Sequence, residues 1–345
     1  MRKTLLGSFI LSIFIFGSVT AGNPDRQGEA GAYELLMNPW ARSSGVNGLN
    51  CANVKGVEAM FINPAGLYSS NKTQVALSHT RWLVPSGINM NACGIAQKVG
   101  KRGALGIGLC SVGFGDIPVT TTENPEGTGA TYSPTFFNVS VGYAHNFADK
   151  VTVAIQLKGI SEAIQDVSAF GFGIDAGVQY SGGEENQFKL GIALRNIGGP
   201  MRYNGEGVAT QLQSISGHNL TYDVRINRFE LPSLLHIGTS YDLNYGEMIS
   251  VTPMVNFTSN SFGRDELGIG AEARITDYFM VRASYKLELG KSDGLENSAY
   301  TGFSAGASLM APLKKKSDSR FGVDYAYRPT SPFQGTHNIG IRLEF

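Results

Sequence analysis

Charge is scarce in this sequence. Charged side chains make up 16% of its 345 residues, whereas an average soluble domain carries about 25%. The formal net charge is zero, so no basic surface indicates a nucleic-acid partner. Beyond Ala21 the chain has no run of roughly 18 apolar residues, and this excludes a transmembrane helix in that part.

Residues that commonly carry chemistry are also few. The five histidines lack the spacing of metal ligands, and no Gly-x-Ser-x-Gly motif presents a nucleophilic serine. We therefore expect no metal, no cofactor and no enzymatic activity. Glycine, in contrast, is abundant at 44 residues, and there are 14 tyrosines and 19 phenylalanines. Low charge with many glycines and aromatics fits a barrel that is apolar outside and polar within.

Both ends of the chain resemble export signals. Arg2 and Lys3 precede an apolar stretch and the small residues Val19-Thr20-Ala21, which predicts a secretory signal peptide over 1–21. At the other end, apolar and polar residues alternate up to a final aromatic. Gly340, Leu343 and Phe345 are typical of the signal read by the barrel assembly machinery of the bacterial outer membrane, although an ordinary amphipathic last strand is the alternative.

Alternation with period two recurs along residues 73–345 and predicts strands with two different faces. The connections between these strands alternate between short and long, as in barrels with short periplasmic turns and longer outer loops. We therefore predict an all-β protein, a 14-stranded antiparallel transmembrane β-barrel in contact with outer-membrane lipids. The expected strands span 73–81, 89–99, 104–115, 134–147, 150–160, 168–180, 187–196, 230–241, 246–257, 266–275, 278–287, 299–310, 320–328 and 336–345.

Residues 22–72 do not share this alternation. They carry a few apolar residues around Trp40 and then a Gly/Asn-rich stretch. A pore of about fourteen strands is wide enough to hold them, because barrel diameter grows with strand number. We expect this segment to be an N-terminal hatch that plugs the barrel, with a tail docked in the periplasm as the alternative.

The hatch segment ends in Asn63-Pro64-Ala65-Gly66-Leu67, preceded by Ala30-Gly31, Pro39 and Ala41-Arg42. This pattern resembles the opening of the PorV/PorQ family, outer-membrane proteins related to the FadL fatty-acid transporters. The resemblance implies a fourteen-stranded barrel with an N-terminal hatch. Where that family commonly has an acidic residue ahead of the motif, this chain departs from the pattern and reads Cys51-Ala52-Asn53-Val54-Lys55-Gly56.

Two cysteines are candidates for a cross-strand bond. If Val99 faces Ala104 across a hairpin, Cys93 and Cys110 face each other, and the parity of Asn89 and Asn91 puts both in the lumen. We predict a disulfide there, with two free thiols as the alternative. Cys51 is expected to stay a buried free thiol. A further prediction is a lumen network of charged residues that supports the hatch. Its expected members are Lys158, Asp175, Arg195, Glu272, Arg274, Arg282, Lys286, Asp324, Arg342 and Glu344.

The longest connection, about 197–229, contains Tyr203, Leu220, Tyr222 and Phe229 and is the expected partner-binding loop. The PorV/PorQ resemblance implies a role in type IX protein secretion, in which members recognise cargo at the cell surface or close the translocon barrel. The type IX translocon and secreted cargo are then the expected partners. Resemblance to the wider FadL group implies passage of a hydrophobic small molecule instead. A lipid-cleaving barrel enzyme is a third possibility with no supporting motif.

Overall fold

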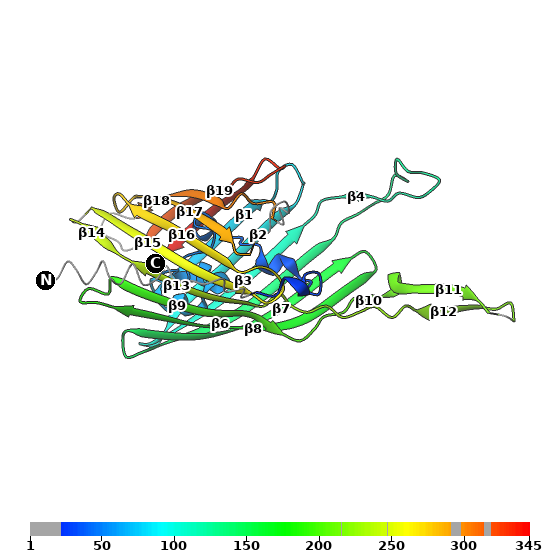
Figure 1. Ribbon diagram of the computed structural model, residues 1–345, viewed down its shortest axis with the longest axis horizontal. Coiled ribbons are helices and arrows are strands. Elements are labelled where there is room, and N and C mark those ends of the chain that lie inside the picture. The colour runs from blue at the N-terminus through cyan, green and yellow to red at the C-terminus, as the bar shows by residue number, and fades with distance from the viewer. Residues whose placement is uncertain (1–21, 215, 247, 291–297, 314–318) are drawn as a thin grey trace.

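The computed structural model describes residues 22–345 except 215, 247, 291–297 and 314–318, so the predicted signal peptide over 1–21 lies outside the described residues. Fourteen antiparallel strands form one closed ring, in which β1 pairs with β20 and completes the sheet (Figure 1). The predicted barrel is confirmed. Its strands are β1 (Thr73–Arg81), β2 (Asn89–Val99), β3 (Gly103–Gly113), β6 (Thr135–Phe147), β7 (Val151–Ile164), β8 (Val167–Gly182), β9 (Phe188–Gly198), β13 (Leu234–Tyr241), β15 (Ile249–Asn260), β16 (Glu266–Arg274), β17 (Phe279–Glu288), β18 (Phe303–Pro312), β19 (Arg320–Arg328) and β20 (Thr336–Glu344).

The two faces of this wall differ as the alternation predicts. Outward side chains such as Leu157 and Phe172 are 59% and 69% exposed, as side chains that meet lipid must be. Inward neighbours such as Gln156 and Asp175 are fully buried. Exposed aromatic residues gather toward both ends of the strands, as in the aromatic girdles of outer-membrane barrels. They include Phe147, Tyr245, Tyr278 and Phe345 at one end and Phe170, Phe172 and Phe303 at the other.

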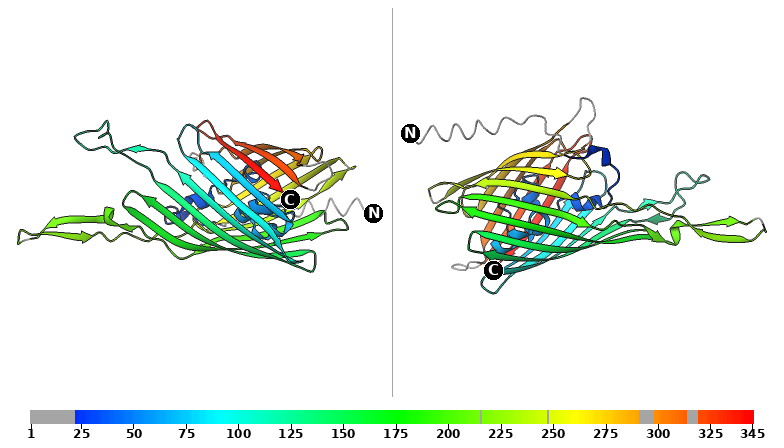
Figure 2. Two further views of the ribbon diagram at one scale, coloured as in Figure 1. Left: turned by 180° about the vertical axis from the view of Figure 1, so that it is seen from behind. Right: turned by 60° about the horizontal axis from the view of Figure 1, so that its bottom comes forward.

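The two ends of the barrel are unequal. The end that carries the C-terminus has short turns, whereas two arms extend far beyond the opposite end (Figure 2). Gly22, where the described part of the chain begins, bridges Arg264 at that opposite end. Because barrels place short turns in the periplasm, the arms lie outside the cell. One arm contains β4 (Ile117–Pro118) and β5 (Thr131–Tyr132), and the other contains β10 (Asn204–Gly205), the 3-10 turn η6 (Glu206–Val208), β11 (Ala209–Gln213) and β12 (Asn219–Asp223). The short β14 (Leu243–Tyr245) pairs with β15 at the periplasmic end.

The N-terminal segment lies inside the ring, as expected of a hatch. It consists of short turns of helix that contact strands on several sides of the wall, η5 against β3, β6, β7 and β8, and α2 against β18, β19 and β20. None of the helices in the described part is long and apolar enough to cross a bilayer. The hatch elements are η2 (Pro24–Arg26), η3 (Tyr33–Leu36), α2 (Ala41–Ser44), η4 (Gly56–Glu58), α3 (Ala59–Ile62) and η5 (Pro64–Ser69).

The predicted disulfide is wrong. Val99 pairs with Gly103 rather than Ala104, so Cys93 faces Leu109 and Cys110 faces Ala92. A register shift of one residue moves a side chain to the other face of a sheet. Cys110 therefore packs against the buried core inside, Cys93 belongs to the outward face, and both are free, as is the buried Cys51. Asn91 also points outward, where its amide oxygen bonds His79, so the assignment of that parity to the lumen was wrong as well.

Candidate functional site

The hatch motif is held to the wall by its asparagine. Asn63 is fully buried, and its amide nitrogen donates to the Cys51 carbonyl and the Val178 carbonyl of β8, each at 3.0 Å. Its amide oxygen accepts a bond from the Ala65 N–H and caps η5. Asn63 therefore ties two parts of the hatch to one strand, which explains why an amide opens the motif.

Wall glycines let the hatch approach. A Cβ on Gly191 of β9 would lie 2.4 Å from the Cys51 carbonyl oxygen, and one on Gly177 of β8 would lie 2.1 Å from the Asn63 amide oxygen. Neither contact is possible for a real side chain at these distances, so Gly191 allows the hatch backbone, and Gly177 the Asn63 and Pro64 side chains, to approach the wall closely. The Cys51–Asn63 part of the hatch is thus seated directly on β8 and β9.

An ionic network fixes the opposite side of the hatch. Arg42 of α2 reaches Glu272 of β16 at 2.6 Å, and Glu272 also binds Arg282 of β17 at 3.1 Å. Arg282 donates to Ser308, Ser308 donates to Asp324, and Asp324 lies 3.6 Å from Arg342. These inward charges connect β16, β17, β18, β19 and β20 in series. A second pair, Lys158–Asp175 at 2.6 Å, is buried near β7 and β8. The predicted lumen network is confirmed for these residues.

A carboxylate in the hatch lacks a hydrogen-bond partner. Both oxygens of Glu34 are buried and without a partner among the described residues. Burial, and then the neighbouring Glu162, raise the pKa of Glu34 to about 8. Tyr203 donates its hydroxyl to Glu162 and packs with Phe229 against the same part of the hatch. The region where the hatch meets the base of the long arm therefore holds a proton at neutral pH.

Glu34→Gln is expected to remove a pH dependence of stability. The folded state keeps the Glu34 proton up to about pH 8, whereas an unfolded carboxyl loses it near the reference value of 4.5. Stability therefore falls as pH rises between these values, and the loss is on the order of 4 kcal/mol above pH 8. The glutamine variant should match the native chain at pH 4 and melt at a higher temperature at pH 9. Heat-dependent gel mobility measures this, with the exposed Glu123→Gln as control. Equal melting of native chain and Glu34→Gln at pH 9 would contradict the assignment.

Two cavities lie at opposite ends of the lumen. One of about 340 Å³ opens at the extracellular mouth and is lined on the hatch side by Asn38, Asn47 and Phe61. The other, of about 390 Å³, opens at the periplasmic end and is lined on the hatch side by Arg42 and Lys55. The same hatch forms the floor of both cavities, and it thereby divides the lumen.

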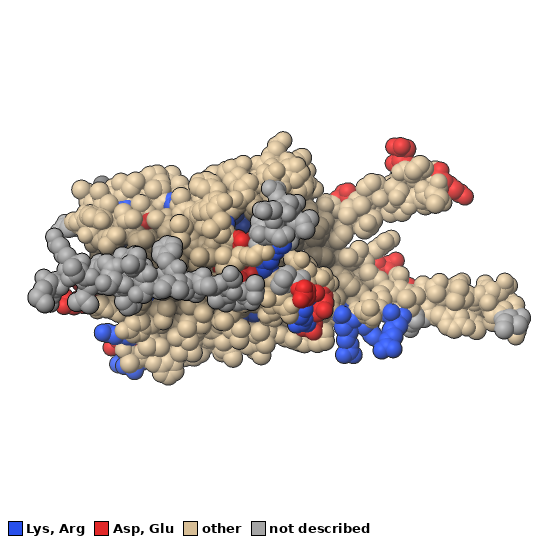
Figure 3. Space-filling model, viewed as in Figure 1, with Lys and Arg blue, Asp and Glu red and all other residues tan. Residues whose placement is uncertain are grey.

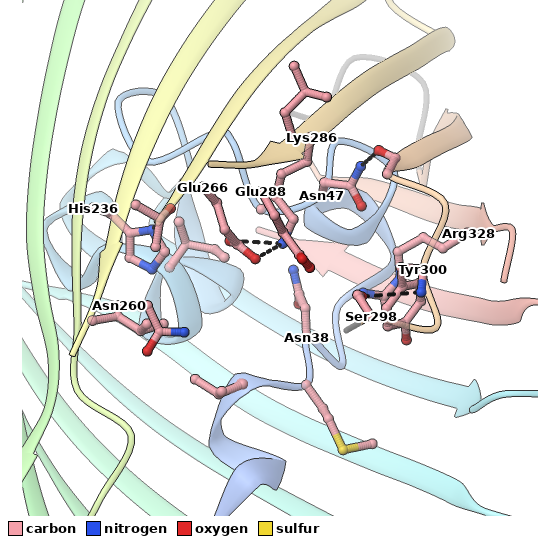
Figure 4. Close-up of a pocket in the computed structure, with 18 of the residues that line it drawn as sticks. Asn38, Asn47, His236, Asn260, Glu266, Lys286, Glu288, Ser298, Tyr300 and Arg328 are labelled. Carbon is pink, nitrogen blue, oxygen red and sulfur yellow. Dashed lines mark hydrogen bonds and ion pairs between the residues drawn. The ribbon is translucent and has the colours of Figure 1, made fainter. Parts of the chain in front are cut away.

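The extracellular cavity is lined by polar groups, aliphatic side chains and aromatic rings. Figure 4 shows Asn38 rising from the hatch into it, with His236 on one side and Tyr300 and Arg328 on the other. Lys286 extends from β17 and binds Glu266 of β16 at 2.9 Å. The Arg328 guanidinium stacks 4.6 Å from the centre of the Tyr300 ring. The mouth cavity, as we call it, therefore offers both charged and neutral polar groups.

The structure separates the four residues of the expected partner-binding loop. Tyr203 and Phe229 lie at the base of the arm and are half-buried against the hatch, with Met201 and Leu231 as neighbours. Leu220 and Tyr222 lie on β12, far beyond the barrel, and are 44% and 46% exposed. Figure 3 shows basic surface at the base of this arm. Arg202, Arg225 and Arg228, which flank the arm's strands in the sequence, are exposed. Only the outer pair is therefore free to meet a partner.

The last strand lies at the seam of the barrel. Phe345 exchanges two backbone hydrogen bonds with Thr73, its side chain is exposed, and Leu343 is on the same outward face. Gly340 has the inward parity of β20, and a Cβ at this position would lie 3.3 Å from the Ala41 Cβ of the hatch. The assembly role of these three residues stays a prediction. In the described part of the chain, no group of three or more potential His, Cys, Asp or Glu ligands is placed to hold a metal ion.

Sequence reasoning missed several inner residues. Glu34, Glu58 and Asn38 of the hatch are buried and polar, and Glu58 accepts bonds from the Ser43 N–H and hydroxyl. Each stands in an otherwise apolar stretch, which is the signal that could have identified it. His236 belongs to the inward parity of β13 and could have been assigned with the other lumen residues.

The fold is that of known hydrocarbon channels. The Pseudomonas putida toluene transporter TodX matches with a TM-score of 0.57 and 14% identity, over 90% of this chain and 99% of that one. The Ralstonia pickettii toluene transporter TbuX matches with a TM-score of 0.56 and 15% identity, over 91% and 98%. A Pseudomonas aeruginosa FadL homologue gives 0.50 and 11%, over 88% and 96%. No curated protein matches the sequence significantly. At these identities the likeness shows the fold alone.

The sequence itself matches a family model over residues 57–343, described as type IX secretion system membrane protein PorP/SprF. The match starts in the hatch and ends in the last strand, so it covers the entire barrel. Together with the lipid-facing wall, it locates the protein in the bacterial outer membrane and its function in type IX secretion. The resemblance to PorV/PorQ thus pointed to a related family. The chain belongs to the PorP/SprF family of type IX secretion system membrane proteins.

Proposed function

We propose that this protein serves type IX secretion from the outer surface of the cell, as a closed barrel that binds secreted proteins with its long arm. The observation that carries the proposal is the unpartnered apolar face of the β11–β12 hairpin. Leu212 pairs with Leu220 and Thr210 with Tyr222, so these side chains share one face. Leu212 and Val224 are 56% and 53% exposed, and β11 and β12 extend far beyond the barrel wall (Figure 1).

The hairpin is suited to strand addition. In the described part of the chain, β11 and β12 pair only with each other, so each has a free outer edge. A two-stranded hairpin is marginally stable alone in water, and an extended segment can extend such an edge while its side chains cover an apolar face. The proposed occupant is therefore a strand of a secreted protein.

The finer assignments remain part of this proposal. Cargo recognition at the surface, which the PorV/PorQ resemblance implied, is the role that we favour over closure of the translocon barrel. The translocon is the expected partner in the membrane, and the barrel assembly machinery is expected to insert the chain through its last strand. The family and the solved relatives act in secretion and transport, and we propose that this chain is likewise not an enzyme.

Passage of a hydrophobic small molecule is the alternative, and the fold of the toluene transporters favours it. A ligand of that class needs an apolar route through the lumen. Here the lumen contains the buried Lys158–Asp175 pair and the Arg42–Glu272–Arg282 network. An apolar ligand would have to displace these charges from their partners, so the interior argues for the secretion role.

Deletion of the gene should reduce the set of secreted proteins, and the arm should be required for rescue. A chain with residues 206–224 replaced by a short Gly-Ser link is expected to reach the outer membrane in normal amount but to restore little secretion, because the docking face is lost. A chain that lacks the other arm, 117–132, is the matched control and is expected to restore it. Mass spectrometry of the culture medium measures the outcome. An unchanged secretome after gene deletion, or full rescue without 206–224, contradicts the proposal.

A further inference from the structure

The carboxylates that line the periplasmic cavity are all engaged. They are Asp242, Glu272 and Glu344, and both oxygens of each already bind a donor within the protein. Glu58 and Asp324 do not line the cavity and have partners of their own. The described lining therefore presents no free carboxylate to a ligand. The donors are Lys189 and Thr252 on Asp242, Arg42 and Arg282 on Glu272, and Arg342, Gln74 and Asn71 on Glu344.

Two cations in the same lining lack a partner. The lining holds six cations against three carboxylates. Among the described residues, the side chains of Lys55 and Arg320 form neither a hydrogen bond nor an ion pair. Arg274 has only an ion pair of 3.9 Å with Asp277, whose side chain is 65% exposed, so water screens this pair. The charged groups left for a ligand are therefore all positive.

Lys55 extends from the hatch into cationic surroundings. Its side chain is exposed to the cavity. Its place inside the lumen, away from bulk water, lowers the pKa of Lys55, and the nearby Lys189 and Arg42 lower it by more than Asp242 and Glu272 raise it. A cleft with protein walls and an excess of one sign of charge concentrates counter-ions. The cavity therefore favours an anion as its ligand.

The free cations are spread across the cavity. Lys55 lies near Lys189 of β9, whereas Arg320 is the first residue of β19. Between these two strands the sheet runs through β13, β15, β16, β17 and β18, and Arg274 ends β16. A compact ion such as phosphate cannot reach all three cations at once. A chain with acidic groups at a distance from one another can do so.

The volume of the cavity, about 390 Å³, is within the usual range for small-molecule pockets, about 300–1,000 Å³. We infer that the periplasmic cavity binds an elongated anion with at least two separate acidic groups, such as the carboxylates of an acidic peptide. Lys55 of the hatch and Arg320 of the wall are its two proposed contacts. This inference does not depend on the proposed docking of secreted proteins at the opposite end of the barrel.

Anion binding can be measured on the full chain in nanodiscs of phosphatidylcholine, whose headgroups carry no net charge. The probes are adipate, a short capped peptide that alternates glutamate with glycine, the same peptide with glutamine, and inorganic phosphate. Calorimetric titration provides the readout. Adipate or the glutamate peptide is expected to bind, phosphate should bind more weakly, and the glutamine peptide should not bind. Higher ionic strength should weaken the binding, because salt screens charges.

Lys55→Gln and Arg320→Gln should each weaken binding roughly tenfold or more, the usual effect of one lost bond to a charged group. Neither change is expected to lower the melting temperature, because neither side chain has a partner in the described fold. Lys150→Gln is the matched control. It removes the same charge from the periplasmic turn between β6 and β7, outside the cavity lining, and should keep native affinity.

The inference is overturned if neither acidic probe binds, or if either cavity variant keeps native affinity. Tighter binding of phosphate than of both acidic probes also overturns it. A free small anion and an acidic segment of a periplasmic protein present the same carboxylates, and the two acidic probes distinguish these sources. Adipate that binds as tightly as the peptide identifies a small anion, tighter binding of the peptide identifies a protein segment, and both outcomes support the class.

Discussion

A chain that lacks residues 22–70 is expected to conduct ions across planar bilayers, whereas the full chain should stay closed. The reason is that the hatch alone separates the cavities of about 340 and 390 Å³ at the two ends of the lumen. Its residues Ser43, Ser44 and Ala65 are fully buried, so the hatch fills the space between wall and centre. A barrel of this strand number lies near the size of aqueous porins once it is emptied.

The wall is suited to survive this deletion. Its strands are continuously paired around the ring, and the inward charges that the hatch now covers would be solvated in a water-filled lumen. Heat-dependent gel mobility reports whether the shortened barrel is folded, and single-channel recording reports conductance. The role of the hatch as a seal is contradicted if the folded barrel without residues 22–70 shows no channel conductance. It is also contradicted if the native chain already conducts ions.

The sequence predicted the strands well because their signal is local. Alternation between lipid-facing and lumen-facing side chains placed β1, β2, β19 and β20 almost to the residue. The strands whose starts were predicted wrongly are shortened by tertiary contacts. β13 begins at Leu234 rather than at 230, because the preceding residues bridge to the hatch at Ala30 and to Met201. β18 begins at Phe303, since Tyr300 bridges instead to Thr330.

Register was harder to predict than strand position. The turn after Val99 has three residues and not four, and Gly100 takes the positive φ of +64° that this turn requires. One residue of error in the register placed Cys110 opposite Cys93, whereas it lies opposite Ala92. The polarity of Asn91 caused a second error, the assignment of Cys93 to the lumen, because an outward residue close to the extracellular end of a strand approaches the polar membrane interface. Polarity therefore marks the lumen reliably only in the middle of a strand.

The sequence predicted which charged residues face the lumen, but not which residues they bind. The inward parity identified Glu272, Arg282 and Asp324 as lumen charges, and these residues do form one network. That Arg42 of the hatch completes it, across 230 positions of sequence, follows only from the closed ring and the path of the hatch within it. Leu220 and Tyr222 were assigned to a partner-binding loop, but the hairpin of β11 and β12 was not predicted, since its strands are short and lie inside a long connection.

Glu272→Ala is expected to destabilise the attachment of the hatch by about 3–5 kcal/mol, the usual cost of removing one partner from a buried ion pair. The change leaves Arg42 and Arg282 facing each other without their shared carboxylate. The Arg282 side chain is fully buried and has little access to water. The uncompensated charge should therefore push Arg42 and α2 away from the wall rather than merely weaken one contact.

Glu266→Ala is the matched control for this change. Glu266 lies on the same strand and also pairs with a cation, Lys286 of β17, but it is partly exposed and makes no bond to the hatch. Loss of such a pair is expected to cost at most about 1 kcal/mol. Glu272→Gln keeps the shape without the charge and should fall between the two. Thermal melting by gel mobility measures stability, and the frequency of channel openings measures release of the hatch. If Glu272→Ala and Glu266→Ala melt alike and neither opens the barrel, the network does not hold the hatch.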